Sequence, residues 1–277
     1  MRIPFKSFFE FFISGKNPAI LGIPFFATAL FLVLSAPLYS WSGPGHRMVA
    51  YVASTLLNPR AKAEVERILQ GKTMVSVATW ADQVRPDRPE TAPYHHVDIP
   101  LRAQDYMPER DGAERLSLIA AIEKFKKVLS NPATSNFDRE EALKFLIHLM
   151  GDLTQPLHCC DNDDSCGNRT FVNFHGKRMK LHHFWDYEIV ANSGLNEREF
   201  GLKIRQMILK ADVSSLQKGE VVDWALESHR EAASYSYVLP SDLNLDDTHI
   251  QKYLPLVEIK LMKASVRLAK ILNDTWP

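Results

Sequence analysis

The chain has 277 residues, of which 45% are apolar and 24% are charged, and this composition excludes a disordered or fibrous protein. The length fits one large domain or two small ones. Basic and acidic residues number 33 each, so the formal net charge is zero and the chain lacks the basic excess of proteins that wrap duplex nucleic acid.

The first 40 residues have the pattern of a secretory signal peptide. Three basic residues within the first sixteen precede an apolar run over 19–34, and a short stretch ending at Ser40 offers a cleavage site. The run is shorter than the roughly 20 residues that span a bilayer as a helix. An uncleaved membrane anchor is the alternative, but the pattern favours cleavage, which makes Trp41 the new amino terminus.

Removal of residues 1–40 leaves a mature domain over 41–277. It carries 30 basic and 32 acidic residues, because the leader holds three of the basic residues and one of the acidic ones, and its net charge is therefore −2. We expect this domain to be secreted or periplasmic, with no stable membrane association.

The mature chain predicts helices almost throughout. Apolar residues recur at helical spacing over 48–57, and Asn58 and Pro59 then cap and start a helix that runs to Leu69 and closes near Gly71. Further helical patterns occupy 116–125, 143–150, 196–210, 219–236 and 247–273. The one convincing strand signal is 169–181, where alternation flanks a His-Gly turn. We therefore predict a single all-α domain that carries a small β-hairpin.

Histidine and aspartate recur at a spacing that suits metal binding. His148 and Asp152 are four residues apart on a predicted helix, and so are His182 and Asp186. Residues at this spacing share one helical face, so both side chains can bind one ion. His158 follows the first pair, and a nitrogen and oxygen ligand set without thiolate suits zinc. A single such pair is usually a solvated or hydrogen-bonded pair, whereas two pairs this close favour a metal site.

Six segments carry a resemblance to a known family. They occur in order along the mature chain: Trp41–His46, Thr79–Arg85, Tyr94–Asp98, Phe145–His158, Gly167-Asn168 and Leu181–Asp186. On these segments the chain resembles the secreted zinc-dependent single-strand nucleases of fungi and plants. These enzymes form the type I nuclease/3′-nucleotidase family, which is related to zinc-dependent phospholipase C.

The resemblance implies a cluster of three zinc ions in a cleft between helices. The implied ligands are Asp82, His95, His148 and Asp152 for one ion, Trp41, His46 and Asp152 for the second, and His158, His182 and Asp186 for the third. Trp41 would bind through its free amino group and its carbonyl oxygen, and Asp152 would bridge two ions. The three ions would also give a mature chain of net charge −2 the means to hold a phosphodiester.

The resemblance also implies hydrolysis of single-stranded DNA and RNA to 5′-nucleotides, together with 3′-nucleotidase activity. Zinc lowers the pKa of bound water to about 7, so a hydroxide held between two ions attacks the phosphate. Asp82 and Asp152 hold those ions, and Arg85 matches an arginine that faces the scissile phosphate. Without the motif, Arg85 would be interpreted as a plain surface arginine.

Three further residues are implied to bind the substrate. His96 occupies the position of an aromatic residue that stacks on a nucleobase, while Asp98 and Asn168 are candidates for reading the base edge. Asp98 could instead orient a histidine ligand. We expect single-stranded nucleic acids and 3′-nucleotides as substrates of a monomeric enzyme.

Two other functional classes stay open at this stage. A zinc-dependent phospholipase C would share the ligands, although Asp186 stands where the lipase branch tends to carry glutamate. A non-catalytic zinc-binding module would also share them, because ligands alone do not prove turnover.

The three cysteines, Cys159, Cys160 and Cys166, lie within eight residues of one another. In an exported protein we expect a disulfide between Cys166 and one of the adjacent pair, with one thiol left over. Replacement of a zinc ligand by a thiolate is the less favoured alternative, since the implied third ligand set is already complete.

Overall fold

The structure is a computed structural model that describes residues 41–112 and 116–277. The leader predicted over 1–40 lies outside the described residues. Within the described residues, no helix combines the length and the apolar character needed to cross a membrane.

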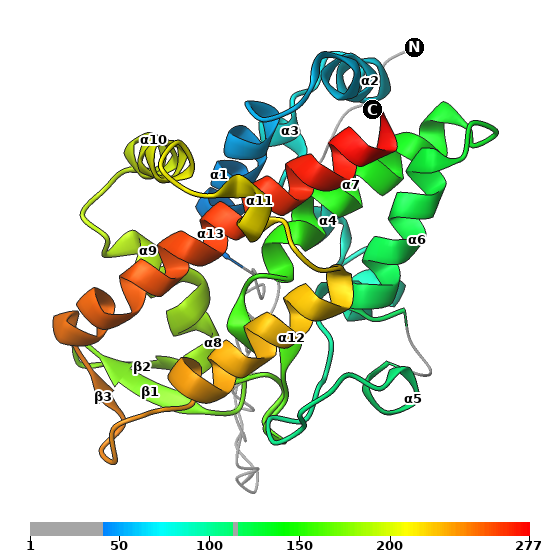
Figure 1. Cartoon of the computed structure of the whole chain (residues 1–277). Helices are drawn as coiled ribbons and strands as arrows, with labels where there is room; N and C mark the ends of the chain where they lie inside the picture. The colour runs from blue at the N-terminus through cyan, green and yellow to red at the C-terminus, as the bar shows by residue number, and fades with distance from the viewer. Residues whose placement is uncertain (1–40, 113–115) are drawn as a thin grey trace, which may run out of the picture. The chain divides into compact units, whose positions relative to one another are not determined.

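Helices make up most of the described chain, and their order confirms the predicted all-α class (Figure 1). The α-helices are α1 (Gly43–Ser54), α2 (Pro59–Leu69), α3 (Met74–Val77), α4 (Trp80–Val84), α5 (Pro108–Asp111), α6 (Leu118–Ser130), α7 (Asn136–Asp152), α8 (Leu181–His183), α9 (Ile189–Ala191), α10 (Glu197–Ile208), α11 (Val213–Leu216), α12 (Val221–Glu231) and α13 (Asp247–Thr275). Two short 3₁₀ segments, η1 (Pro89–His95) and η2 (Pro156–Cys159), and two π segments, η3 (Phe184–Glu188) and η4 (Ala232–Ser236), connect or extend them.

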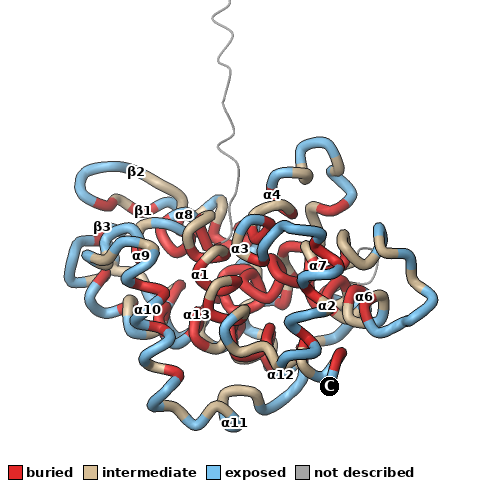
Figure 2. Tube along the Cα trace, turned by 90° about the horizontal axis from the view of Figure 1, so that it is seen from above, coloured by how far each residue is buried: buried red, intermediate tan, exposed pale blue. Residues whose placement is uncertain are grey.

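The core lies around α1, α7 and α13, which contact one another and carry the densest run of buried residues (Figure 2). Helix α7 is buried on every face over its last eight residues, from Phe145 to Asp152. A helix that is covered all round belongs to the centre of a domain. The polar residues near its end, His148 and Asp152, are therefore placed in the core by the packing of the surrounding helices.

The predicted start of α2 is confirmed in detail. The Asn58 side chain accepts a hydrogen bond from the Ala61 amide at 2.7 Å, and Pro59 occupies the first turn. The helix ends at Leu69, and Gln70 takes the left-handed conformation (φ 49°) one residue before the predicted Gly71. The preceding helix, α1, ends at Ser54, so the last part of the predicted 48–57 stripe lies in a turn.

The predicted hairpin forms from β1 (Phe171–Phe174) and β2 (Lys177–Lys180), which pair in antiparallel register across the His175-Gly176 turn. A third strand, β3 (Asn244–Leu245), adds to β1 in parallel and makes a three-stranded sheet in the order β2-β1-β3. The sequence did not predict β3, because two residues are too few to show an alternating pattern.

Candidate metal centre

Eight buried histidines and aspartates converge at the end of α7. They form three sets whose ligand atoms lie within 4.8 Å of one another: His46, His148 and Asp152; Asp82, His95 and His148; and His158, His182 and Asp186. These are eight of the nine residues that the sequence placed around metal ions. The structure thus brings together residues from α1, α4, η1, α7, η2, α8 and η3.

In the first two sets, α7 supplies His148 and Asp152 one turn apart, with His148 Nε2 3.5 Å from Asp152 Oδ2. His148 Nδ1 lies 2.8 Å from the Ala78 carbonyl oxygen. A carbonyl can only accept, so Nδ1 carries the proton and Nε2 presents its lone pair to the aspartates. His95 Nδ1 completes the arrangement at 3.0 Å from Asp152 Oδ2.

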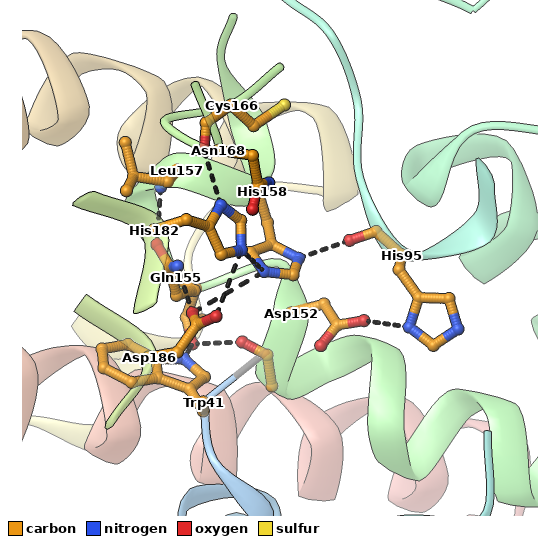
Figure 3. A network of polar contacts seen from close by, with 12 residues as sticks. Trp41, His95, Asp152, Gln155, Leu157, His158, Cys166, Asn168, His182 and Asp186 are labelled. Carbon is orange, nitrogen blue, oxygen red and sulfur yellow. Dashed lines mark hydrogen bonds and ion pairs between the residues drawn. The ribbon is translucent and has the colours of Figure 1, made fainter. Parts of the chain in front are cut away.

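In the third set, backbone carbonyl groups orient the imidazole rings in the same way. His158 Nδ1 donates to the His95 carbonyl oxygen at 2.6 Å, and His182 Nδ1 donates to the Cys166 carbonyl oxygen. Their Nε2 atoms therefore face each other at 3.0 Å with lone pairs, next to the Asp186 carboxylate (Figure 3). Two lone pairs at this distance repel unless a cation lies between them. A proton or a metal ion is the cation that fits.

The path of the chain from His182 to Asp186 differs from the predicted α-helix. Helix α8 ends at His183, and the following segment, η3, is a π-helix. His182 Nε2 still lies 3.2 Å from Asp186 Oδ2. Single π turns are rare and occur mostly at functional sites, where they re-aim a side chain.

Several buried polar atoms of the cluster have no hydrogen-bond partner. Among the described residues these include both carboxylate oxygens of Asp82, Asp152 Oδ1, His95 Nε2 and His148 Nε2. An unpaired buried polar atom costs about 1–3 kcal/mol, and more when it is charged. A cation bound between these atoms would remove the cost, so the residues present fit metal ions.

The pKa values agree with this interpretation. Burial raises the pKa of Asp82 to about 7, and burial lowers the pKa values of His95 and His148 to about 4. Burial also lowers the pKa of His158 well below its ordinary value. For His182, burial is the largest cause and acts in the same direction, but the Asp186 and Asp152 carboxylates and the Cys166 carbonyl together outweigh it, and the net pKa is raised. The low pKa values keep three imidazoles neutral at pH 7, as metal binding requires.

The ninth predicted ligand, Trp41, is fully buried beside the cluster. Its indole nitrogen donates to Thr154 Oγ1 at 3.4 Å, and the next amide, that of Ser42, donates to the Asp186 carbonyl oxygen at 2.8 Å. A side chain on Gly45 would place a Cβ atom 2.7 Å from Trp41 Cβ. Residue 41 is thus held against the turn after α7 and against the third set.

The structure adds two residues whose roles the sequence did not indicate. Gln155 Nε2 donates to Asp186 Oδ1 at 2.5 Å and thereby fixes that carboxylate. Gly151 lets the His46 ring lie directly on α7, because a Cβ atom there would be 2.7 Å from His46 Nδ1. The glutamine and glycine belong to the quoted motif, but their roles depend on contacts that the spacing does not reveal.

A pocket of about 650 Å³ opens over the cluster. His95, His158 and His182 line it, together with all the residues predicted to contact the substrate, which are Arg85, His96, Asp98 and Asn168. Arg85 is about one-fifth exposed, and its Nη1 lies 3.8 Å from Asp82 Oδ1. The arginine therefore faces the pocket.

The predicted disulfide is not formed, since all three cysteines are free thiols. The Cys159 thiol donates to the Leu153 carbonyl oxygen at 3.4 Å, and the Cys166 thiol contacts Asp98 Oδ1 at 3.5 Å. These two side chains are directed to other partners, which explains why the expectation was wrong for this structure.

The family of the chain follows from comparison with known proteins. The family described as S1/P1 Nuclease matches residues 41–276. The chain belongs to the S1/P1 nuclease family. It is 28% identical to Endonuclease 1 of Arabidopsis thaliana, with 90% of this chain and 94% of that protein covered. It is 27% identical to Nuclease P1 of Penicillium citrinum, over 84% and 97%, and to Nuclease S1 of Aspergillus oryzae, over 89% and 95%. Membership decides in favour of the nuclease, a phosphodiesterase, among the three classes that the sequence left open.

Gly151→Ala tests the close approach of His46 to α7. The added methyl group must push the His46 ring away from Asp152, so we expect metal affinity to fall about tenfold or more, the scale of disturbing a ligand's support. Metal content after dialysis against a graded chelator measures this. Gly201→Ala is the matched control, because it also lies within a helix but its Cβ would meet Tyr51 at an ordinary 3.4 Å. Equal metal retention in the two variants would contradict the assignment.

Asp82→Asn tests the charge balance of the cluster. Because its folded pKa of about 7 lies above the ordinary value of 3.8, Asp82 makes the metal-free fold less stable as pH rises from about 4 to 7. Without metal, the variant should therefore have the higher Tm at pH 8 and nearly the same Tm at pH 4. With zinc at pH 8 the order should reverse. Asp105→Asn, at an exposed carboxylate, should show no reversal, and wild-type protein that stays more stable without metal at pH 8 would contradict the prediction.

Proposed function

We propose that the chain is an exported phosphodiesterase with three zinc ions, which hydrolyses single-stranded DNA and RNA to 5′-nucleotides and removes 3′-phosphates from nucleotides. The observation that carries the proposal is the position of three buried His/Asp sets beneath one pocket. Family membership supports the phosphodiesterase activity, and names such as Nuclease S1 and Nuclease P1 support nucleic acid as the substrate.

In this proposal Asp82, His95, His148 and Asp152 would hold one ion, Trp41, His46 and Asp152 a second, and His158, His182 and Asp186 the third. Zinc ions bound there would acidify water and neutralise phosphate charge. The support for zinc is the donor set, which contains imidazole and carboxylate without thiolate.

The remaining chemistry belongs to side chains of the pocket. Arg85 points into it and would donate a fork of hydrogen bonds to the phosphate, whose charge grows in the transition state. Asp82 Oδ1 lies 3.8 Å from Arg85 Nη1 and would attract the guanidinium toward the cluster. His96, Asp98 and Asn168 line the same pocket and would receive a nucleobase, which a single strand offers without unpairing. A monomer would suffice, since one chain supplies the whole site.

Export accounts for the leader. We propose a signal peptide over 1–40 and a nuclease domain over 41–277 that acts outside the cytoplasm, with Trp41 as its amino terminus. The family match begins at residue 41, and the buried indole of Trp41 anchors that end of the domain beside the cluster.

The proposed activity is tested by hydrolysis of single-stranded DNA, RNA, 3′-AMP and phosphatidylcholine side by side, with zinc measured in the same samples. We expect turnover of the first three substrates only and about three zinc ions per chain. Asp152→Asn should lose zinc and nearly all activity, because in the proposed assignment this carboxylate would hold two of the three ions. Asp163→Asn, at an exposed residue of the loop after η2, is the control that should keep both. Hydrolysis of phosphatidylcholine alone would overturn the proposal.

Arg85→Ala separates phosphate stabilisation from metal binding. The variant should keep its zinc and lose about a hundredfold or more in kcat, the scale of removing one preorganised donor. Arg60→Ala, on the exposed side of α2, should change neither quantity. An unchanged rate in Arg85→Ala would show that this residue is a surface arginine without a role in catalysis.

An added residue before Trp41 tests the amino-terminal ligand. A backbone nitrogen can bind zinc only as a free amine, because an amide nitrogen has no available lone pair. Protein made with one extra methionine should fold, hold one zinc ion weakly and hydrolyse phosphodiesters slowly, compared with exported and cleaved protein reloaded in the same way. Equal metal content and equal rates would exclude Trp41 as a ligand and leave the other sets standing.

A further inference from the structure

A fourth group of ligand-type side chains lies in the pocket wall, outside the three sets already described. His96, Asp98 and Cys166 present one ligand atom each, and these atoms lie within 4.8 Å of one another. His96 Nδ1 is 2.7 Å from Asp98 Oδ1, and Cys166 Sγ is 3.5 Å from the same oxygen. All three residues line the pocket.

The backbone holds Cys166 in this position from two sides. Its amide donates to Asp161 Oδ1 at 3.0 Å, and its carbonyl oxygen accepts the proton of His182 Nδ1. Cys166 also takes the left-handed conformation, with φ 57°. For a residue other than glycine this conformation is strained, and it persists only where the surroundings enforce it. The thiol is therefore directed at Asp98 by a fixed loop.

The geometry points to a fourth divalent-cation site at His96, Asp98 and Cys166, and we propose that zinc, or another thiophilic ion, binds there through imidazole nitrogen, carboxylate oxygen and thiolate sulfur. This donor set is one that zinc takes in proteins, with a solvent molecule as the fourth ligand. On binding, the sulfur–hydrogen bond of Cys166 breaks, a sulfur–metal bond forms, and the proton passes to solvent. No change of oxidation state is involved.

This site differs from the three sets in chemistry and in consequence. None of the three sets contains a thiol, and all their residues are buried, whereas His96 and Asp98 are partly exposed. An ion at the fourth site would occupy the part of the pocket that the proposed function gives to a nucleobase. Zinc beyond the amount that fills the three sets should then inhibit by competing with substrate. That consequence rests on the proposed function, but the binding itself does not.

Cobalt(II) provides a direct test, because a thiolate-to-cobalt charge-transfer absorption in the near ultraviolet can come only from a site that contains cysteine. We expect this absorption to grow in reduced wild-type protein only after the cysteine-free sets have taken up cobalt. Zinc should abolish it by displacement. Absence of the absorption at excess cobalt would overturn the proposal, and so would a disulfide that consumes Cys166 in the exported protein.

Matched variants assign the absorption to its residues. Cys166→Ser should abolish it and remove one weakly bound metal ion per chain. Cys159→Ser should keep it, because that thiol is fully buried and directed at the Leu153 carbonyl oxygen. Asp98→Asn should weaken cobalt binding at the site while leaving the thiol in place. This variant tests the site independently if Cys166→Ser does not fold. An absorption that persists in Cys166→Ser would contradict the assignment.

Activity assays keep the two proposals apart. If both hold, excess zinc raises the apparent KM of wild-type protein at least severalfold and has little effect on that of Cys166→Ser. A cobalt absorption in a protein without nuclease activity would support the fourth site and refute the proposed function. If excess zinc inhibits wild-type protein and Cys166→Ser equally, zinc at the fourth site does not compete with the substrate, and that part of the proposal is overturned.

Discussion

Buried charge is the constraint on which the rest of the structure depends. Three aspartates, Asp82, Asp152 and Asp186, lie in the core with five imidazoles, and burial holds at least three of these imidazoles neutral. Buried carboxylates without paired cations are strongly destabilising. The rise of the Asp82 pKa to about 7 is the response of the chain alone to this problem. Bound metal ions would relieve the same repulsion, so the chemistry of the buried residues fits a metal site.

The orientation of three of the five cluster histidines, His148, His158 and His182, comes from the backbone. The carbonyl groups of Ala78, His95 and Cys166 each accept the Nδ1 proton of one ring, so that Nε2 of each ring faces the cluster. A carbonyl in a fixed loop or short helix cannot rotate away, so the tautomer is set by the fold. The packing that places these carbonyl groups around α7 therefore also orients the lone pairs of the three rings.

The sequence could predict features formed by residues close together in the chain, but it could not predict contacts between residues far apart in the chain. The four-residue spacing of His148 and Asp152 and the cap at Asn58 are local, and both are seen in the structure. The carbonyl partner of His148 is 70 residues away in the chain, and that of His158 is 63 residues away. The π segment after α8 has no distinct pattern of its own. The expected disulfide failed for a related reason, because sequence proximity of cysteines does not say where their thiols point.

Cys166 joins the two halves of the pocket. Its carbonyl oxygen orients His182, a member of the third set, while its thiol contacts Asp98, which faces the place proposed for the base. Movement of its backbone would alter both contacts, and the hydrogen bond from its amide to Asp161 opposes that movement. One residue in a left-handed conformation thus contacts both the third set and the part of the pocket proposed to receive a nucleobase. A ligand that displaces the Cys166 backbone would therefore also move the carbonyl oxygen that orients the His182 ring, whereas rotation of the thiol alone would leave that ring in place.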